Sequence, residues 1–270
     1  MNNIIYKKQI ISYIIILSIP LLLIGCIPNN RHAISLKERL ESISKTNKIS
    51  EKDLYIRALI RMELLDYQGA IKDFNKLKVI NPNINEYFLY SGIANQKHGD
   101  YRQAIKDYNK AIISSQNKDD KELNYFKRGD LYWKLMQYNK AKQDFDNAIK
   151  INSEEMDTFY KRSNIKYLMG DTRGAIKDLD KALELNNKSA DSYHNRGSLK
   201  FSEGNIIGSL KDFNLAIKYN KNSSITYYNR SIAKYKLNKK KSACLDLNKS
   251  IKLGYEVLEK YHKIICSISK

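Results

Sequence analysis

Apolar residues along most of the chain recur with helical spacing, and short polar segments interrupt them at regular intervals. The pattern predicts pairs of helices, each pair joined by a tight turn. A small residue fixes the register, because it returns at steps of 34, 37, 34, 34 and 34 residues, as Ala70, Ala104, Ala141, Ala175, Ser209 and Ala243. A second small residue stands twelve positions earlier each time, as Ala58, Gly92, Gly129, Ser163, Gly197 and Ser231. The sequence therefore predicts an all-α repeat array.

Six repeats follow from this register, and we expect them to span residues 51–84, 85–121, 122–155, 156–189, 190–223 and 224–256. Within each repeat, positions 2 to 14 form helix A and positions 18 to 30 form helix B. The small residues at positions 8 and 20 let the two helices cross closely, and large apolar residues at positions 4 and 24 fill the remaining space. The longer second repeat has three extra residues in the polar stretch 114–121, which we expect to be a surface loop.

Turn residues agree with these helix boundaries. Gly99, Gly170 and Gly204 stand between helices A and B, where a residue with positive φ closes helix A. Each is followed by Asp or Asn, which are good N-caps for helix B.

A helical hairpin of 34 residues with small residues at positions 8 and 20 resembles the tetratricopeptide repeat (TPR). The resemblance covers residues 51–256 and implies an α-solenoid of about six repeats, with residues 257–270 as a C-terminal capping helix. The chain departs from the family pattern in two respects. Only Pro82 keeps the proline of position 32, and Lys166, Lys200 and Lys234 replace the usual aromatic residue of position 11.

Two rows of opposite charge follow the same register. Position 7 is arginine in five repeats, as Arg57, Arg128, Arg162, Arg196 and Arg230. Position 23 is aspartate in all six, as Asp73, Asp107, Asp144, Asp178, Asp212 and Asp246. Because a binding site seldom needs the same pair in every repeat, we interpret these residues as structural ion pairs.

The first residues have the composition of a secretion signal, with Lys7 and Lys8 before an apolar run that ends at Gly25-Cys26. The sequence Leu23-Ile24-Gly25-Cys26 resembles the lipobox of bacterial lipoproteins. The resemblance implies a signal peptide at 1–25, cleavage before Cys26, a diacylglycerol thioether on its sulfur and an acyl group such as palmitate on its amino group. Residues 26–50 then form a tether. The alternatives are an uncleaved N-terminal anchor and an ordinary secretion signal.

The same resemblance implies a place in the bacterial cell envelope, with the chain attached to a membrane by lipid. Ile27 rather than Asp follows the lipidated cysteine, which favours the outer membrane over the inner membrane or the cell surface. The formal net charge of +19 falls to +17 when Lys7 and Lys8 are removed with the signal. Export makes nucleic acid an unexpected partner, so anionic lipid or an acidic protein fits the charge better, although a Lys-rich compositional bias also explains it.

Candidate chemistry is sparse. His32, His98, His194 and His262 are far apart and lack metal-ligand spacing, and no phosphate-binding loop or catalytic triad pattern occurs. We therefore expect no enzyme activity, no cofactor and no metal. Cys244 stands at position 21, where other repeats place Ile or Leu, and we interpret it as a small core residue. A bridge between Cys244 and Cys266 is the less favoured reading.

In the TPR family the concave face is lined by helix A, at positions 2, 5, 6, 9, 12 and 13. Here positions 5 and 12 offer aromatic residues and one histidine: Phe126, Trp133, Tyr160, Tyr167, His194, Phe201, Tyr228 and Tyr235. Positions 6 and 9 add asparagines: Asn164, Asn195 and Asn229. Aromatic residues dominate binding hot spots, and Asn both donates to and accepts from a peptide backbone. The aromatic residues also fit a packing role between helices.

These features predict a membrane-anchored TPR scaffold that binds a protein or peptide segment in its groove, in cell-envelope assembly. The alternative is a basic spacer protein that associates with anionic lipid or an acidic polymer at the envelope. Salt distinguishes the two, because exposed charge interactions are screened over about 8 Å at physiological ionic strength.

Overall fold

The computed structural model describes residues 30–46 and 48–267. These residues form fourteen α-helices and no strand, so the predicted all-α helical array is confirmed. The predicted signal peptide and Cys26 lie outside the described residues. None of the helices in the described ranges combines the length and the apolar character needed to cross a membrane.

The chain divides into two compact units, residues 1–77 and 78–270. The first unit holds α2 (Asn30–Ser44), α3 (Glu51–Glu63) and most of α4 (Tyr67–Ile80). The second unit begins with the end of α4 and continues with α5 (Asn85–His98), α6 (Tyr101–Ser114), α7 (Lys118–Lys134), α8 (Tyr138–Ile151), α9 (Met156–Leu168), α10 (Thr172–Leu185), α11 (Ala190–Ser202), α12 (Ile206–Tyr219), α13 (Ser224–Lys236), α14 (Lys240–Lys252) and α15 (Glu259–Cys266).

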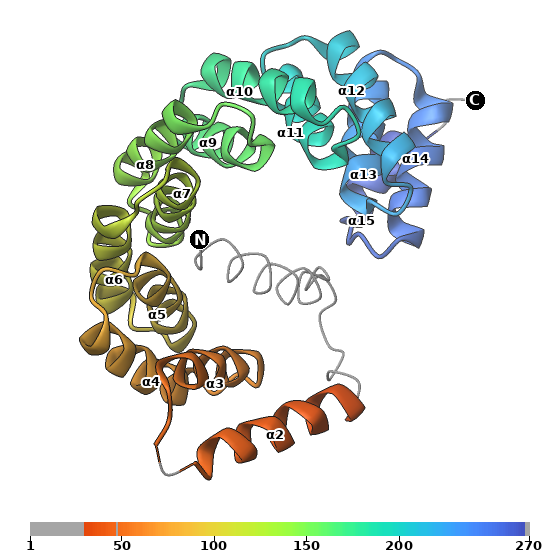
Figure 1. The fold of residues 1–270 in the computed structure, drawn as a ribbon. Helices are drawn as coiled ribbons and strands as arrows, with labels where there is room; N and C mark the ends of the chain where they lie inside the picture. The colour runs from red at the N-terminus through yellow and green to blue at the C-terminus, as the bar shows by residue number, and fades with distance from the viewer. Residues whose placement is uncertain (1–29, 47, 268–270) are drawn as a thin grey trace. The chain divides into compact units, whose positions relative to one another are not determined.

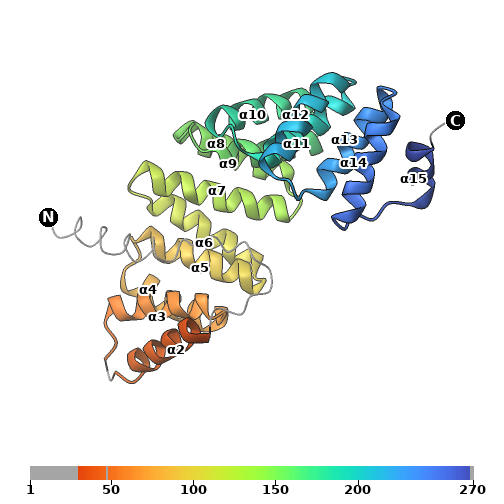
Figure 2. The same cartoon turned by 90° about the vertical axis from the view of Figure 1, so that its right-hand side faces the viewer.

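Within the second unit, helices follow one another as antiparallel pairs in chain order (Figure 1). The first helices of the pairs, α5, α7, α9, α11 and α13, lie on the inner side of the row, and their partners α6, α8, α10, α12 and α14 lie on the outer side. Each helix contacts the next, and α5 also contacts α7, as their side-by-side positions in Figure 2 show. The first helices therefore form a continuous face.

Close helix crossings depend on the small residues at position 8. A Cβ placed on Gly197 would lie 2.9 Å from the ring of Phe213, a position-24 residue of the paired helix. Phe213 and its equivalent Phe145 are buried. The clusters extend into the following repeat, since Ile165 of α9 packs against Ala141 and Phe145 of α8. Such clusters therefore tie neighbouring repeats together.

The turn residues adopt the predicted backbone. Gly99, Gly170 and Gly204 have φ of 97°, 84° and 81°. Met136 stands at the equivalent place in the third repeat with φ of 57°, a conformation that glycine adopts at lower cost. The left-handed residue is thus common to these repeats even where glycine is absent.

One expectation about the second repeat is wrong. The stretch 114–121 is not a loop throughout, because Ser114 ends α6 and α7 begins at Lys118. The side chain of Asn117 caps α7 by accepting a hydrogen bond from the Asp120 N–H at 2.8 Å. Asp119 and Asp120 stand in the first turn, where negative charge is favourable near the positive end of the helix dipole. The extra residues therefore lengthen α7 at its N-terminus.

The predicted Arg–Asp pairs form along the array. Arg162 donates from Nε and Nη2 to the two carboxylate oxygens of Asp178 at 2.8 and 2.7 Å. Lys166 adds a contact of 2.9 Å to Asp178, and Arg162 reaches Asp146 of the preceding repeat at 2.7 Å. The same bidentate pairing recurs as Arg57–Asp73, Arg128–Asp144, Arg196–Asp212 and Arg230–Asp246.

The second repeat replaces the missing arginine with a lysine from a different helix. Its position 7 is Ser91, which donates to Asp107 at 2.7 Å. Lys78, at the end of α4, reaches the same carboxylate at 3.0 Å. The buried aspartate of position 23 therefore has a cationic partner in this repeat as well.

The C-terminal end corrects the expectation that Cys244 and Cys266 stay unpaired. The two residues form a disulfide with a Cα–Cα distance of 4.9 Å across a sequence separation of 22. The pairing is possible because the chain turns at Gly254 and returns α15 onto α14, with Ile265 buried against Ala243 and Leu247. Ile265 thereby takes the place that Ile165 occupies in an inner repeat.

The carboxyl group of Glu122 in α7 predicts a pH effect on stability. Burial raises its pKa to about 7, and the like charges of Glu155 and Asp119 add to this effect. The folded chain holds the Glu122 proton more tightly than the unfolded chain does, so protonation of Glu122 stabilises the fold. This stabilisation is fully present below the usual Glu pKa and is lost as pH rises through about 7. We expect Glu122→Gln to raise the melting temperature at about pH 8 and to leave it unchanged at about pH 4.

Thermal unfolding followed by circular dichroism checks this expectation. Glu154→Gln, which changes an exposed carboxyl group in the connection between α8 and α9, serves as the control. Equal gains for Glu122→Gln at both pH values would contradict the prediction.

Candidate ligand-binding face

The eleven residues predicted to line the groove all lie on α7, α9, α11 and α13. We call the surface formed by the outward-facing side chains of these four helices the A face. None of the eleven side chains is fully buried, and Tyr167 is the most open, at 50 % exposure. They are therefore placed where a ligand can reach them, although their engagement with neighbouring helices differs.

The centre of the A face is a cluster of three polar side chains from two helices. Asn195 of α11 donates from Nδ2 to the Tyr160 hydroxyl and to Asn164 Oδ1 of α9, both at 3.1 Å. Because one amide group holds both partners, the orientation of all three side chains is fixed. The Asn195 Oδ1 acceptor is left over from this arrangement, and the Asn164 amide, which also hydrogen-bonds Tyr160, keeps a second N–H donor.

A second polar contact lies one helix further along. Asn229 of α13 donates to the Ser198 hydroxyl at 3.3 Å, and Ser198 donates to the backbone carbonyl of His194 at 3.0 Å. Beside it is a small hollow of about 190 Å³, lined by Ser198, Phe201, Phe213, Asn229 and Ile232. The structure thus brings Asn229 and Phe201 together at an indentation of the A face.

Trp133 has a neighbour that the sequence pattern did not single out. The ammonium group of Lys161 lies 4.8 Å from the centre of the Trp133 ring, and it forms a 2.6 Å ion pair with Asp130. Lys161 is at position 6 and Asp130 at position 9, both of which line the concave face in the TPR pattern. Position alone was therefore the signal that could have identified them.

Several predicted groove residues take part in packing. Phe126 lies 5.7 Å from the buried ring of Phe145. Tyr228 and Tyr235 pack against the C-terminal cluster around Leu247, and the Tyr228 ring lies 4.6 Å from that of Tyr255. These aromatic residues hold the helices together as well as forming part of the A face.

His194 is also held by the scaffold. Its Nδ1 lies 2.9 Å from the Thr226 hydroxyl, and its ring lies 5.9 Å from Phe213. Burial lowers the pKa of His194, and burial raises the pKa of Tyr160. Both groups are therefore neutral near pH 7. Together with the asparagines they offer uncharged donors and acceptors, which suits recognition of amide groups.

No set of three or more His, Cys, Asp or Glu residues in the described part of the chain is placed to hold a metal ion.

Comparison with known proteins identifies the repeat. The tetratricopeptide repeat model matches residues 124–155 and 157–189. The crystal structure of YrrB, described as a TPR protein with an unusual peptide-binding site, aligns with a TM-score of 0.58 at 20% identity, over 67% of this chain and 92% of that one. No curated protein matches the sequence.

Two further solved structures show the same architecture. The crystal structure of MamA aligns with a TM-score of 0.56 at 19% identity, over 60% of this chain and 93% of that one. The C-terminal part of a TPR repeat-containing protein from Cytophaga hutchinsonii aligns with a TM-score of 0.64 at 18% identity, over 74% of this chain and 78% of that one. The protein is therefore an all-α TPR helical repeat array.

Proposed function

We propose that the A face binds an extended peptide segment of a partner protein, without catalysis. The observation that carries the proposal is the fixed Tyr160–Asn164–Asn195 cluster. Asn195 Oδ1 is an acceptor and Asn164 Nδ2 is a donor, and the two come from adjacent first helices of the array. A peptide group in an extended chain offers the complementary N–H and C=O, so the pair suits backbone recognition.

Aromatic side chains near this cluster supply the apolar part of the interaction. Tyr167 lies on the same helix as Asn164, and Phe201 lines the hollow beside Asn229. Buried aromatic contacts contribute large area at low entropic cost, which is why they are enriched in binding hot spots. The structure of YrrB, described as holding a peptide-binding site on a TPR scaffold, supports the same use of this architecture.

A peptide-display selection tests this proposal. Peptides selected on the wild-type protein are expected to bind Asn195→Ala more weakly by about tenfold, because the substitution removes one amide and releases Tyr160 and Asn164 from their fixed positions. Asn139→Ala, on the exposed surface of α8, is the matched control and is expected to bind as the wild type does. Equal affinity of Asn195→Ala and wild type for every selected peptide would rule out this face.

We further propose that the protein is a lipoprotein of the bacterial cell envelope, anchored through Cys26, and that its partner belongs to envelope assembly. The lipobox-like sequence before Cys26 supports the anchor. The disulfide between Cys244 and Cys266 supports export, because disulfides persist in oxidising compartments outside the cytosol.

Metabolic labelling with a palmitate analogue tests the anchor. The wild-type chain is expected to incorporate the label and to remain in the membrane fraction, whereas Cys26→Ser is expected to incorporate none. Cys244→Ser is the control, since it removes a cysteine and keeps the lipobox. Labelling of Cys26→Ser at the wild-type level would refute lipidation at this site.

A further inference from the structure

The turns between paired helices gather at one edge of the second unit. Every pair has the same orientation in the array, so the A-to-B turns repeat on one side and the B-to-A connections on the other. We call the first side the turn edge and define it as residues 96–103, 133–140, 167–174, 201–208 and 235–242. The two edges differ in charge, whereas both expose large apolar side chains.

The turn edge is strongly basic. Its first three turns carry the exposed cations Lys97, Arg102, Lys134, Lys140 and Arg173. Its last turn carries Lys236, Lys239, Lys240 and Lys241. The acids on this edge are Asp100, Asp171 and Glu203, and the first two accept backbone N–H groups as helix caps, from Gln103 and Gly174.

The opposite edge has mixed charge with many acids. The start of α7 carries Asp119, Asp120 and Glu122, and Glu154, Glu155 and Asp157 lie at the connection to α9 and its first turn. Lysines such as Lys118 and Lys221 lie there as well. The turn edge therefore carries a larger excess of positive charge than the opposite edge.

Large apolar side chains project from the same edge. Met136, Leu168, Met169 and Ile207 are all exposed, and so is Leu245 of α14, next to the last turn. Met136 is the clearest case, because 74% of it is exposed and its φ of 57° is one that glycine adopts at lower cost. A side chain exposed to this degree contributes little to folding and is accessible for contact at the surface.

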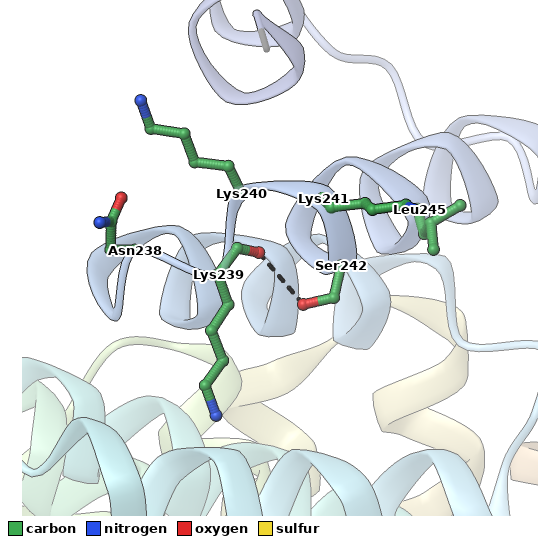
Figure 3. A pocket seen from close by; sticks show the side chains of 6 residues that line it. All are labelled: Asn238, Lys239, Lys240, Lys241, Ser242 and Leu245. Carbon is green, nitrogen blue, oxygen red and sulfur yellow. Dashed lines mark hydrogen bonds between the residues drawn. The ribbon is translucent and has the colours of Figure 1, made fainter. Parts of the chain in front are cut away.

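The last turn shows how the two kinds of side chain combine. Lys239, Lys240 and Lys241 surround an open hollow of about 450 Å³ together with Leu245 (Figure 3). Lys239 and Lys240 extend from the turn in different directions, while Lys241 and Leu245 come from neighbouring turns of α14. Ser242 donates to the carbonyl of Lys239 at 3.1 Å and closes the turn. The lysines of this turn and an apolar side chain thus line the same hollow, with Lys241 beside Leu245.

We propose that the turn edge docks on an anionic phospholipid bilayer. Lysine heads remain at the phosphate groups while their aliphatic stems and the exposed Met, Leu and Ile side chains enter the boundary between headgroups and acyl chains. A highly charged polymer would contact the lysines alone, so the apolar side chains would remain in water. A bilayer contacts both the lysines and the apolar side chains, and this contact does not require the Tyr160–Asn164–Asn195 cluster or an anchor at Cys26.

Fluorescence quenching by brominated lipids tests the proposal on the full chain. A tryptophan placed at the turn edge by Met136→Trp is compared with one placed at the opposite edge by Ile113→Trp. The two sites match in openness, since Met136 is 74% and Ile113 78% exposed. Both variants retain Trp133, so its signal is common to the two. The proteins are reconstituted in vesicles of phosphatidylcholine alone or phosphatidylcholine mixed with phosphatidylglycerol.

Quenching of Met136→Trp above the level of Ile113→Trp is expected only when phosphatidylglycerol is present, and it should decline with added salt. Adding Lys240→Gln to Met136→Trp is expected to lower the ratio of docked to undocked chains roughly fivefold, since one lysine near an anionic surface contributes about that factor. Equal quenching at the two edges, or quenching that does not depend on phosphatidylglycerol, would overturn the proposal. Lysine-dependent binding of polyglutamate with no quenching by lipid would also overturn it, in favour of an acidic protein.

Discussion

Asp178→Ala is expected to lower the free energy of unfolding by about 3–5 kcal/mol, the usual cost of breaking a buried ion pair from one side. The Asp178 side chain is only 5% exposed and accepts from Arg162 and Lys166. Removing the carboxylate leaves two cations in a poorly hydrated site between α9 and α10. Because the A face is formed by other side chains, the affinity for a bound peptide should change little.

Chemical denaturation measures this loss, and Asp180→Ala is the matched control. Asp180 lies two residues away on the same helix and pairs with Arg196, but its side chain is 49% exposed. An exposed pair contributes about 0–1 kcal/mol, so the control should remain close to the wild type. Equal losses for the two variants would mean that the repeated Arg–Asp pairs do not stabilise the array through burial.

The ion pairs also show how far the sequence predicts this fold. The helix pairs and the facing of positions 7 and 23 follow from the period, because a repeated small residue fixes the phase of both helices. The contact from Arg162 to Asp146 in the preceding repeat does not follow, since it depends on how neighbouring pairs stack. The period therefore predicts contacts within a repeat better than contacts between repeats.

For the candidate site, too, the positions of the residues were predictable and their side-chain contacts were not. The resemblance to TPR proteins placed all eleven predicted residues on the first helices of their pairs, where the structure finds them. Which of them would contact one another was not predictable. Asn164 and Asn195 meet, whereas His194 is held by Thr226 and Lys161 covers the ring of Trp133. Side-chain partners depend on the spacing between successive helices, which position numbers do not contain.

The C-terminal end and the start of α7 escaped prediction because both break the period. Polar residues in 118–121 suggested a loop, but Asn117 and the first-turn aspartates are favourable at a helix N-terminus. Cys244 fits a core position, and nothing in the repeat predicts that the last segment folds back. Only the turn at Gly254 and the packing of Ile265 bring Cys266 to it.

Removing the disulfide by Cys244→Ser with Cys266→Ser is expected to destabilise the attachment of α15 by about 3 kcal/mol, the loop-entropy value for a bridge across about twenty residues. The remaining contacts on this short helix centre on one buried side chain, Ile265, against Ala243 and Leu247. Without the bridge, amide hydrogens of α15 should exchange faster by roughly a hundredfold, while those of α9 keep their protection.

Hydrogen exchange with mass spectrometry separates the bridge from other effects of the substitutions. A reductant should accelerate exchange in α15 of the wild type and have no effect on the double variant, which has no bond to reduce. The effect should extend to α14, because Ala243 and Leu247 lose the cover of Ile265, and to Tyr228, which packs on the same cluster. If the reductant changes neither helix, the packing of Ile265 alone closes the array and the bridge adds nothing to it.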